Sequence, residues 1–158
     1  GIKVFLDVDD LKDIGALEEY IRRTQMILFF LSQGYFRSPN CLREIRATLE
    51  QSKPLVLVQE ADPAKGGGTL QALRDECPDE LQSDIFDQGR TQTTWYRIEE
   101  FQRVSLKIIV EAVLLCSPDY VGQDALGLYV PGEPRTHSFA LAKPVTLWAS
   151  PANAGALD

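Results

Sequence analysis

The chain has 158 residues, of which 44% are hydrophobic and 25% are charged, and its formal net charge is −7. This length supports one domain with a sizeable core plus a tail, and the composition argues against disorder throughout. The negative charge argues against a protein that binds the phosphate backbone of nucleic acids, because that affinity comes largely from lysine and arginine.

The sequence carries no signal for a membrane or for secretion. Its apolar runs fall far short of the ~20 residues that span a bilayer, and its first residues do not follow the basic, apolar, small-residue pattern of a secretory leader. Cys41, Cys77 and Cys116 are widely spaced without a CxxC pair, which predicts reduced thiols and no metal or disulfide framework. We therefore expect a cytoplasmic protein. Because the chain opens on Gly1 and a strand begins at once, we also expect a piece of a longer protein.

The first predicted elements alternate between strands and helices. Residues 2–6 are predicted to form a strand, and an acidic loop at 7–15 leads into a short helix at 16–23. The continuous apolar run at 26–31 is typical of a parallel strand that is covered on both faces. A loop of about nine residues follows this strand, and a helix is predicted at 41–51.

The alternation continues up to a long helix. The expected elements are a strand at 54–58, a loop at 61–69, a short helix at 70–77 and an ambiguous polar stretch at 78–94, in which 83–86 or 93–96 adds a short strand. The longest helical pattern covers 98–115 and should pack on the sheet. Its predicted inward face consists of Ile98, Phe101, Val104, Ser105, Ile108, Ala112 and Leu115.

Strands that alternate with helices at this spacing predict an α/β fold with a parallel sheet, of the flavodoxin-like, doubly wound type with flanking helices. We assign residues 1–116 to this domain. The composition changes at Ser117, and residues 117–158 form a proline-rich tail with one predicted strand at 145–150.

The segment 38–45 starts the helix that follows the buried strand at 26–31. Open α/β sheets bind their ligands outside the carboxyl ends of the strands, which is where this segment begins. Ser38 or Asn40 can cap the helix, and Pro39 suits its first turn. The residues that recur at helical spacing and form the stripe toward the sheet are Leu42, Ile45 and Leu49.

Glu44 lies roughly 120° from the centre of that stripe, on the flank that it shares with Cys41 and Thr48. This position allows its carboxylate to sit at the rim of a cleft. Without further information, the favoured interpretation of Glu44 is an exposed acid in the first turn that interacts favourably with the helix dipole.

Four short motifs follow one another in the first part of the chain. They are the strand and acidic loop at 4–11 followed by Gly15, the strand end at 30–32, the Gly-Tyr-Phe triplet at 34–36 and the segment 38–45. Together they resemble a TIR (Toll/interleukin receptor) domain over residues 2–115. In that family the last motif commonly reads Ser, a gap, Trp-Cys and then Glu-Leu or Glu-Ile, and here Asn40 replaces the Trp.

The resemblance implies a function as well as a fold. Enzymatic members of the family cleave the nicotinamide–ribose bond of NAD⁺, and their catalytic glutamate matches Glu44. NAD⁺ is then a substrate, and no cofactor or metal is expected. The resemblance also implies that the acidic loop borders the nucleotide cleft and mediates contacts between domains. The residues expected around the substrate are Asp7, Asp9, Asp10, Gly15, Tyr35 and Cys41.

A carboxylate suits this reaction, because it stabilises the positive charge of an oxocarbenium-like ribose as nicotinamide leaves. Two hypotheses therefore stand: an intracellular signalling domain that acts as an NAD⁺ nucleosidase, and a non-catalytic TIR-like module that self-associates or recruits other TIR domains. Neither hypothesis requires nucleic acid or a membrane as a partner.

Alternatives exist for two of the motifs. A strand followed by Asp7-x-Asp9 also opens phosphohydrolases that resemble the haloacid dehalogenase superfamily and hold Mg²⁺, although the later spacing is compressed for that fold. The same acids are otherwise solvated loop residues. Trp95 and Tyr96, which precede the long helix, are favoured as an anchor between sheet and helix over a role in stacking on a base.

The sequence departs from a complete TIR domain at its start. A first strand and helix are missing, and in the order 2-1-3-4-5 that first strand lies between the strands at 2–6 and 26–31. Such a vacancy leaves unpaired strand edges in the core. We expect the strand at 145–150 either to fill it or to begin a second module. Because the start of the domain is missing, we do not expect this chain to catalyse the reaction efficiently by itself.

Overall fold

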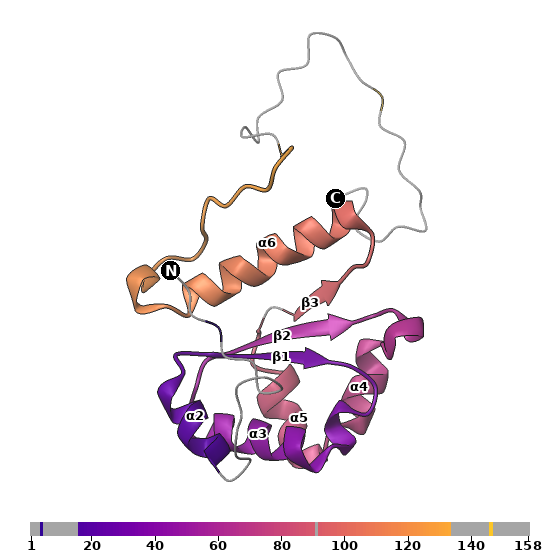
Figure 1. Cartoon of the computed structure of the whole chain (residues 1–158), viewed down its shortest axis with the longest axis vertical. Coiled ribbons are helices and arrows are strands. Elements are labelled where there is room, and N and C mark those ends of the chain that lie inside the picture. The colour runs from indigo at the N-terminus through magenta and orange to yellow at the C-terminus, as the bar shows by residue number, and fades with distance from the viewer. Residues whose placement is uncertain (1–3, 5–15, 91, 134–145, 147–158) are drawn as a thin grey trace.

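The computed structural model describes residues 4, 16–90, 92–133 and 146 (Figure 1). These residues form a three-stranded parallel sheet with flanking helices, which confirms the predicted α/β class and is compatible with a flavodoxin-like fold. The predicted loop at 7–15 and most of the predicted strands at 2–6 and 145–150 lie outside the described residues. Val4 and Thr146, which are described, are exposed and belong to no helix or strand.

Strands and helices alternate along the described chain. The strands are β1 (Ile27–Leu31), β2 (Leu55–Glu60) and β3 (Gln92–Trp95). The α-helices are α2 (Leu17–Arg23), α3 (Pro39–Glu50), α4 (Leu70–Glu76), α5 (Asp79–Phe86) and α6 (Glu99–Leu115). Short 3-10 helices are η2 (Tyr35–Arg37), η3 (Pro63–Lys65) and η4 (Pro118–Tyr120). Among the described residues, no helix is long and apolar enough to cross a membrane.

The sheet has the order β1-β2-β3, with β2 in the centre and all pairs parallel. Helices α2, α3, α4 and α5 lie on one face of the sheet, and α6 lies on the other (Figure 1). The main core fills the space between the sheet and the first group of helices, because both present apolar residues to it. Its buried residues are Phe29, Leu31, Phe36, Ile45, Leu55, Leu57, Leu73, Cys77, Leu81 and Ile85.

Helix α3 forms as its sequence predicts. Ser38 is the N-cap, and its hydroxyl oxygen accepts a hydrogen bond of 3.4 Å from the backbone N–H of Cys41. Pro39 occupies the first turn, where its missing N–H costs nothing. Ile45 is fully buried, and Leu42 and Leu49 pack against the core at its edges, so the predicted stripe does face the sheet.

The polar stretch at 78–94 was predicted to add a short strand at 83–86 or at 93–96, and the structure has a helix at the first of these positions. Residues 83–86 belong to α5, so the prediction of a strand there is wrong. Leu81 and Ile85 are buried four residues apart, and this helical period puts both into the core. The alternative strand, predicted at 93–96, is found as β3 one residue earlier.

Helix α6 is confirmed, but it is less buried than predicted. Ser105 is its buried residue, and its hydroxyl donates to the carbonyl oxygen of Thr94 at 2.7 Å. Phe101 and Val104 were predicted to face inward, yet they are 54% and 49% exposed. The small side chain of Ser105 brings the helix close to β3, and the flanks of α6 carry apolar residues that the described chain leaves in contact with solvent.

After α6 the chain folds back along the helix, and we call residues 117–133 the strap (Figure 1). Lys107 forms an ion pair with Glu133 and lies over the ring of Tyr129, 5.8 Å from its centroid. One turn further along α6, the carboxylate of Glu111 accepts a hydrogen bond of 2.7 Å from the backbone N–H of Leu126. Two α6 side chains therefore contribute the polar contacts that hold the strap in place.

We expect the substitution Lys107→Met to loosen the strap, because it removes a partly buried ion pair and the cation over Tyr129. Chymotrypsin cleavage after Tyr129 should become about tenfold faster, since local opening sets the cleavage rate of a folded chain. The matched control is Arg22→Met, which removes a surface pair with Glu19 within α2, on the other face of the sheet. Equal cleavage rates for the two variants would contradict a holding role for Lys107.

Candidate functional site

The carboxyl ends of the three strands lead into the segments from which α/β proteins build their sites. β1 is followed by the turn at 32–38, β2 ends at Glu60, and β3 leads through Tyr96 and Arg97 into α6. The predicted catalytic residue, Glu44, lies on α3, which starts directly after the first of these turns.

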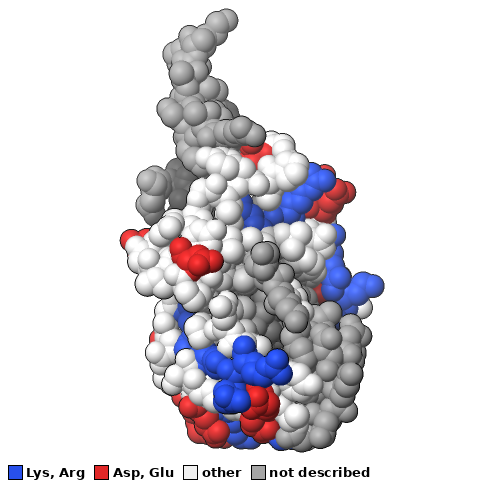
Figure 2. All heavy atoms as spheres, turned by 60° about the vertical axis from the view of Figure 1, so that its left-hand side comes forward, with Lys and Arg blue, Asp and Glu red and all other residues white. Residues whose placement is uncertain are grey.

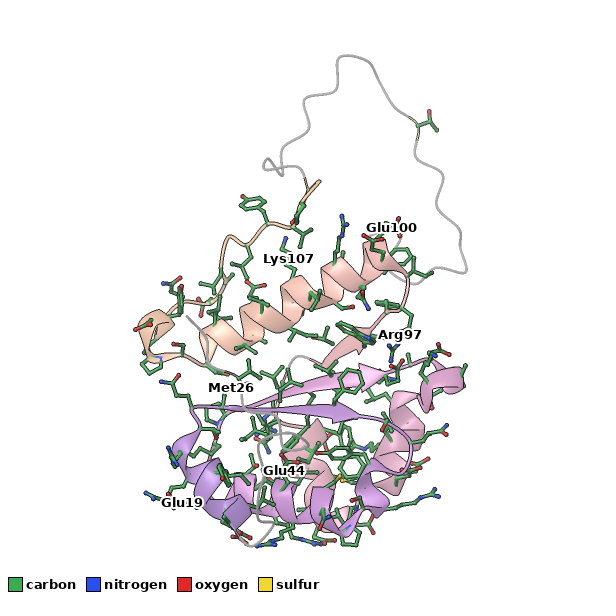
Figure 3. All side chains as sticks on the ribbon, in the orientation of Figure 1. Glu19, Met26, Glu44, Arg97, Glu100 and Lys107 are labelled. Carbon is green, nitrogen blue, oxygen red and sulfur yellow. The ribbon has the colours of Figure 1, made fainter. Side chains whose placement is uncertain are left out.

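Glu44 and Tyr35 come together in the structure. Glu44 is half-buried within the helical layer (Figure 3), and the Tyr35 hydroxyl donates a long hydrogen bond of 3.4 Å to its Oε2. The backbone carbonyl of Glu44 accepts a hydrogen bond of 2.7 Å from the Thr48 hydroxyl. The Tyr35 ring is fixed by Phe29 and Phe36, whose ring centroids lie 6.1 Å and 5.5 Å away. Two of the predicted site residues are therefore neighbours.

The remaining predicted site residues divide into two groups. Cys41 is half-buried in the first turn of α3, three residues before Glu44, and thus on the same side of that helix. The four residues of the expected cleft loop lie outside the described residues: Asp7, Asp9, Asp10 and Gly15. Among the described residues, no group of three His, Cys, Asp or Glu side chains could hold a metal ion.

A buried acid at the end of β2 was not predicted. Glu60 is 1% exposed, and its Oε2 accepts a hydrogen bond of 3.1 Å from Arg97 Nε and a second, shorter one from the same guanidinium. Its Oε1 accepts a hydrogen bond of 3.0 Å from the backbone N–H of Asp62. Arg97 lies where β3 turns into α6 (Figure 3), so the pair ties the central strand to the start of that helix.

The glycines after β2 allow the chain to return closely onto the end of that strand. A Cβ at Gly67 would lie 2.6 Å from both the backbone nitrogen of Asp62 and the carbonyl oxygen of Glu60. The backbone N–H of Gly68 donates to that same carbonyl at 3.1 Å. The sequence predicts a loop here, and the structure adds the steric reason for glycine at position 67.

Trp95 at the end of β3 and the next residue, Tyr96, make different contacts. Trp95 packs edge-on against Phe30 of β1, with ring centroids 6.2 Å apart. Tyr96 packs against Phe101 of α6 at 5.8 Å. The first contact lies within the sheet, and the second joins the residue after β3 to α6, so the predicted anchor role fits Tyr96.

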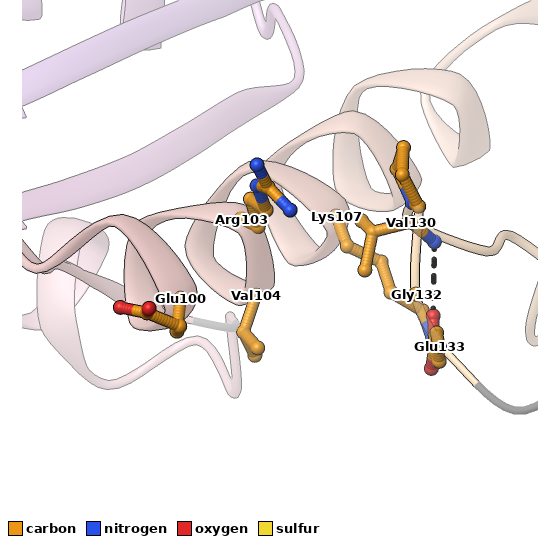
Figure 4. A pocket seen from close by; sticks show the side chains of 8 residues that line it. Glu100, Arg103, Val104, Lys107, Val130, Gly132 and Glu133 are labelled. Carbon is orange, nitrogen blue, oxygen red and sulfur yellow. Dashed lines mark hydrogen bonds and ion pairs between the residues drawn. The ribbon is translucent and has the colours of Figure 1, made fainter.

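Glu44 lines neither of two shallow hollows on the described part of the chain. One, of about 350 Å³, lies between α6 and the end of the strap (Figure 4), where Glu133 Oε2 accepts a hydrogen bond of 3.0 Å from the N–H of Val130. The other, of about 250 Å³, lies between α2 and α3, where Arg43 pairs with Glu18 at 2.6 Å. Figure 2 shows basic side chains beside acidic ones, as expected where most charges are paired.

The thiols of Cys77 and Cys116 are not activated by their surroundings. Burial raises the pKa of the Cys77 thiol to about 11, and burial also raises the pKa of Cys116. A raised pKa lowers the fraction of thiolate, which is the nucleophilic form. Neither residue therefore has the character of a catalytic nucleophile.

The raised pKa of Cys77 predicts a specific dependence of stability on pH. Its contribution is fully present below the thiol's ordinary pKa of 9.0, and it is lost as the pH rises toward about 11, because the unfolded chain gives up the proton first. Urea unfolding at pH 8.5 and 10.5 should therefore show a smaller loss of stability for Cys77→Ala than for the wild type. Equal losses for the two proteins would refute this linkage.

Comparison with protein-family models, with curated proteins and with solved structures finds no match. The likeness to TIR domains therefore rests on the order of the sequence motifs.

Proposed function

We propose that the chain is a TIR-like signalling domain that acts in the cytoplasm and cleaves NAD⁺ at the nicotinamide–ribose bond. The contact between Glu44 and Tyr35 is the observation that carries this proposal. It joins the residue that matches the family's catalytic glutamate to a hydroxyl from the turn after β1. Tyr35 belongs to the turn after the carboxyl end of β1, where α/β folds bind ligands, and Glu44 lies in the second turn of the helix that starts after it.

Glu44 has the chemistry that this cleavage requires. As the bond between nicotinamide and C1 of the ribose breaks, its electron pair leaves with neutral nicotinamide and positive charge builds up on the ribose. The Glu44 carboxylate stabilises that charge, and water then adds to C1 and gives ADP-ribose and a proton. In this proposal the acids Asp7, Asp9 and Asp10, with Gly15, form the loop that borders the cleft, and Cys41 and Tyr35 line the pocket.

The test is release of nicotinamide from NAD⁺ by the full-length protein at high concentration, compared with its Glu44→Ala variant. Release that the substitution abolishes supports the proposal. Equal release by both proteins would remove Glu44 from the mechanism, and a wild type that releases nothing would leave the second candidate function.

That second candidate is a non-catalytic module that binds other TIR domains or a second copy of itself. The exposed apolar residues of α6 favour it, since Phe101, Val104 and Leu106 leave large apolar surfaces in water. Light scattering separates the two functions. Self-association that depends on concentration, without release of nicotinamide, would identify the chain as an interaction module.

A further inference from the structure

The turn that carries Tyr35 is held from a distant part of the chain. Gly34 adopts a left-handed conformation with φ of 80°, and the 3-10 helix η2 follows at once. Glu76 is the last residue of α4, and its side chain is 13% exposed. Its Oε2 accepts a hydrogen bond of 2.7 Å from the backbone N–H of Gly34, and its Oε1 pairs with Arg37 at 3.1 Å.

We propose that Glu76 is a positioning residue of the Glu44 site: it fixes the turn at 34–37, and the turn directs the Tyr35 hydroxyl toward Glu44. Its effect on catalysis rests on the proposed NAD⁺ cleavage, whereas its effect on the geometry does not. The two contacts of Glu76 lie on either side of Tyr35 in the sequence. They therefore clamp the backbone from which this side chain projects.

A carboxylate is needed for this arrangement, because both contacts require an acceptor. The Gly34 N–H and the Arg37 guanidinium are donors, and an ionised carboxylate offers two acceptor oxygens. Hydrogen bonds to an ionised group are also the stronger ones. A glutamine at position 76 would keep one acceptor and turn its NH₂ group toward a donor.

Other contacts of the turn act together with Glu76. Phe29 and Phe36 pack against the Tyr35 ring and hold its plane. Backbone hydrogen bonds tie Gln33 to Gly66 and close the turn itself. The oxygen of a tyrosine hydroxyl lies on the axis of its ring, so these ring contacts and the backbone that Glu76 holds together set where the Tyr35 hydroxyl lies.

The experiment is a double-mutant cycle between Glu76→Gln and Tyr35→Phe in the full-length protein, with Asp75→Asn as the control on the exposed side of α4. The first readout is the ¹³C chemical shift of the Glu44 carboxyl carbon, which reports its hydrogen bonding without any need for activity. The second readout is kcat and KM for nicotinamide release. Urea unfolding shows that each variant is folded. Arg37→Met, at a mostly exposed side chain, removes one of the two contacts if Glu76→Gln does not fold.

We expect Glu76→Gln to move the Glu44 signal in the same direction as Tyr35→Phe, and to lower kcat about three- to tenfold with KM unchanged. In the Tyr35→Phe background, Glu76→Gln should change neither the Glu44 chemical shift nor kcat any further. The effects of two substitutions are not additive when one residue acts through the other. An unmoved Glu44 signal, or equal movement in both backgrounds, would overturn the proposal. A wild type that releases no nicotinamide would refute the proposed function, while the chemical shifts would still decide the role of Glu76.

Discussion

Replacing Arg97 with methionine is expected to lower the free energy of unfolding by about 3 kcal/mol. The reason is the environment of Glu60, which is 1% exposed at the end of the central strand and receives two hydrogen bonds from Arg97. Without the guanidinium, the Glu60 carboxylate is a buried negative charge without its charged partner. Its Oε1 still accepts the hydrogen bond from the Asp62 N–H. Removing one partner of a buried pair costs more than the pair itself contributes.

Urea unfolding of the wild type and the variant at pH 7 measures this loss. The control is Arg103→Met, which removes an exposed pair within α6 and should cost about 0.5 kcal/mol or less. The double variant Arg97→Met with Glu60→Gln should regain part of the stability, since the buried charge is then gone. An Arg97→Met protein as stable as the wild type would show that water replaces the guanidinium without cost.

Elements with strong local patterns were predictable from the sequence. The stripe Leu42, Ile45 and Leu49, with its Ser38 cap, predicted α3 correctly because cap and period act within a few residues of one another. The apolar run at 26–31 predicted β1 correctly, but its predicted burial on both faces is wrong, because Leu28 and Phe30 are each 39% exposed. The residues Glu44 and Tyr35 are nine positions apart, and both belong to motifs that local reading detects.

Features that depend on distant contacts were not predictable in this way. Glu60 and Arg97 are separated by 37 positions, and nothing near either residue indicates that one is the partner of the other. The contact between Gly34 and Glu76 spans 42 positions. The exposure of Phe101 was missed because periodicity shows which side of a helix is apolar, but not how much of that side a neighbouring layer covers.

Replacing Glu44 with glutamine is expected to lower kcat for nicotinamide release by about 10²- to 10³-fold. Glutamine keeps the size of the side chain and one oxygen that can accept from the Tyr35 hydroxyl, so the fold and the binding of NAD⁺ should change little. The negative charge is lost, and with it the stabilisation of the positive ribose in the transition state. KM should therefore stay close to that of the wild type.

The most direct test of a catalytic role for Glu44 is the rate of nicotinamide release by the wild type, Glu44→Gln and Glu50→Gln. The three proteins are compared at equal concentration and must have equal urea midpoints. Glu50 is an exposed acid near the end of the same helix, which makes it a matched control for the loss of one charge. We expect release by the wild type and by Glu50→Gln at similar rates, and a rate at least about 10²-fold lower for Glu44→Gln. Equal rates for all three proteins, or no release by the wild type, would contradict a catalytic role for Glu44.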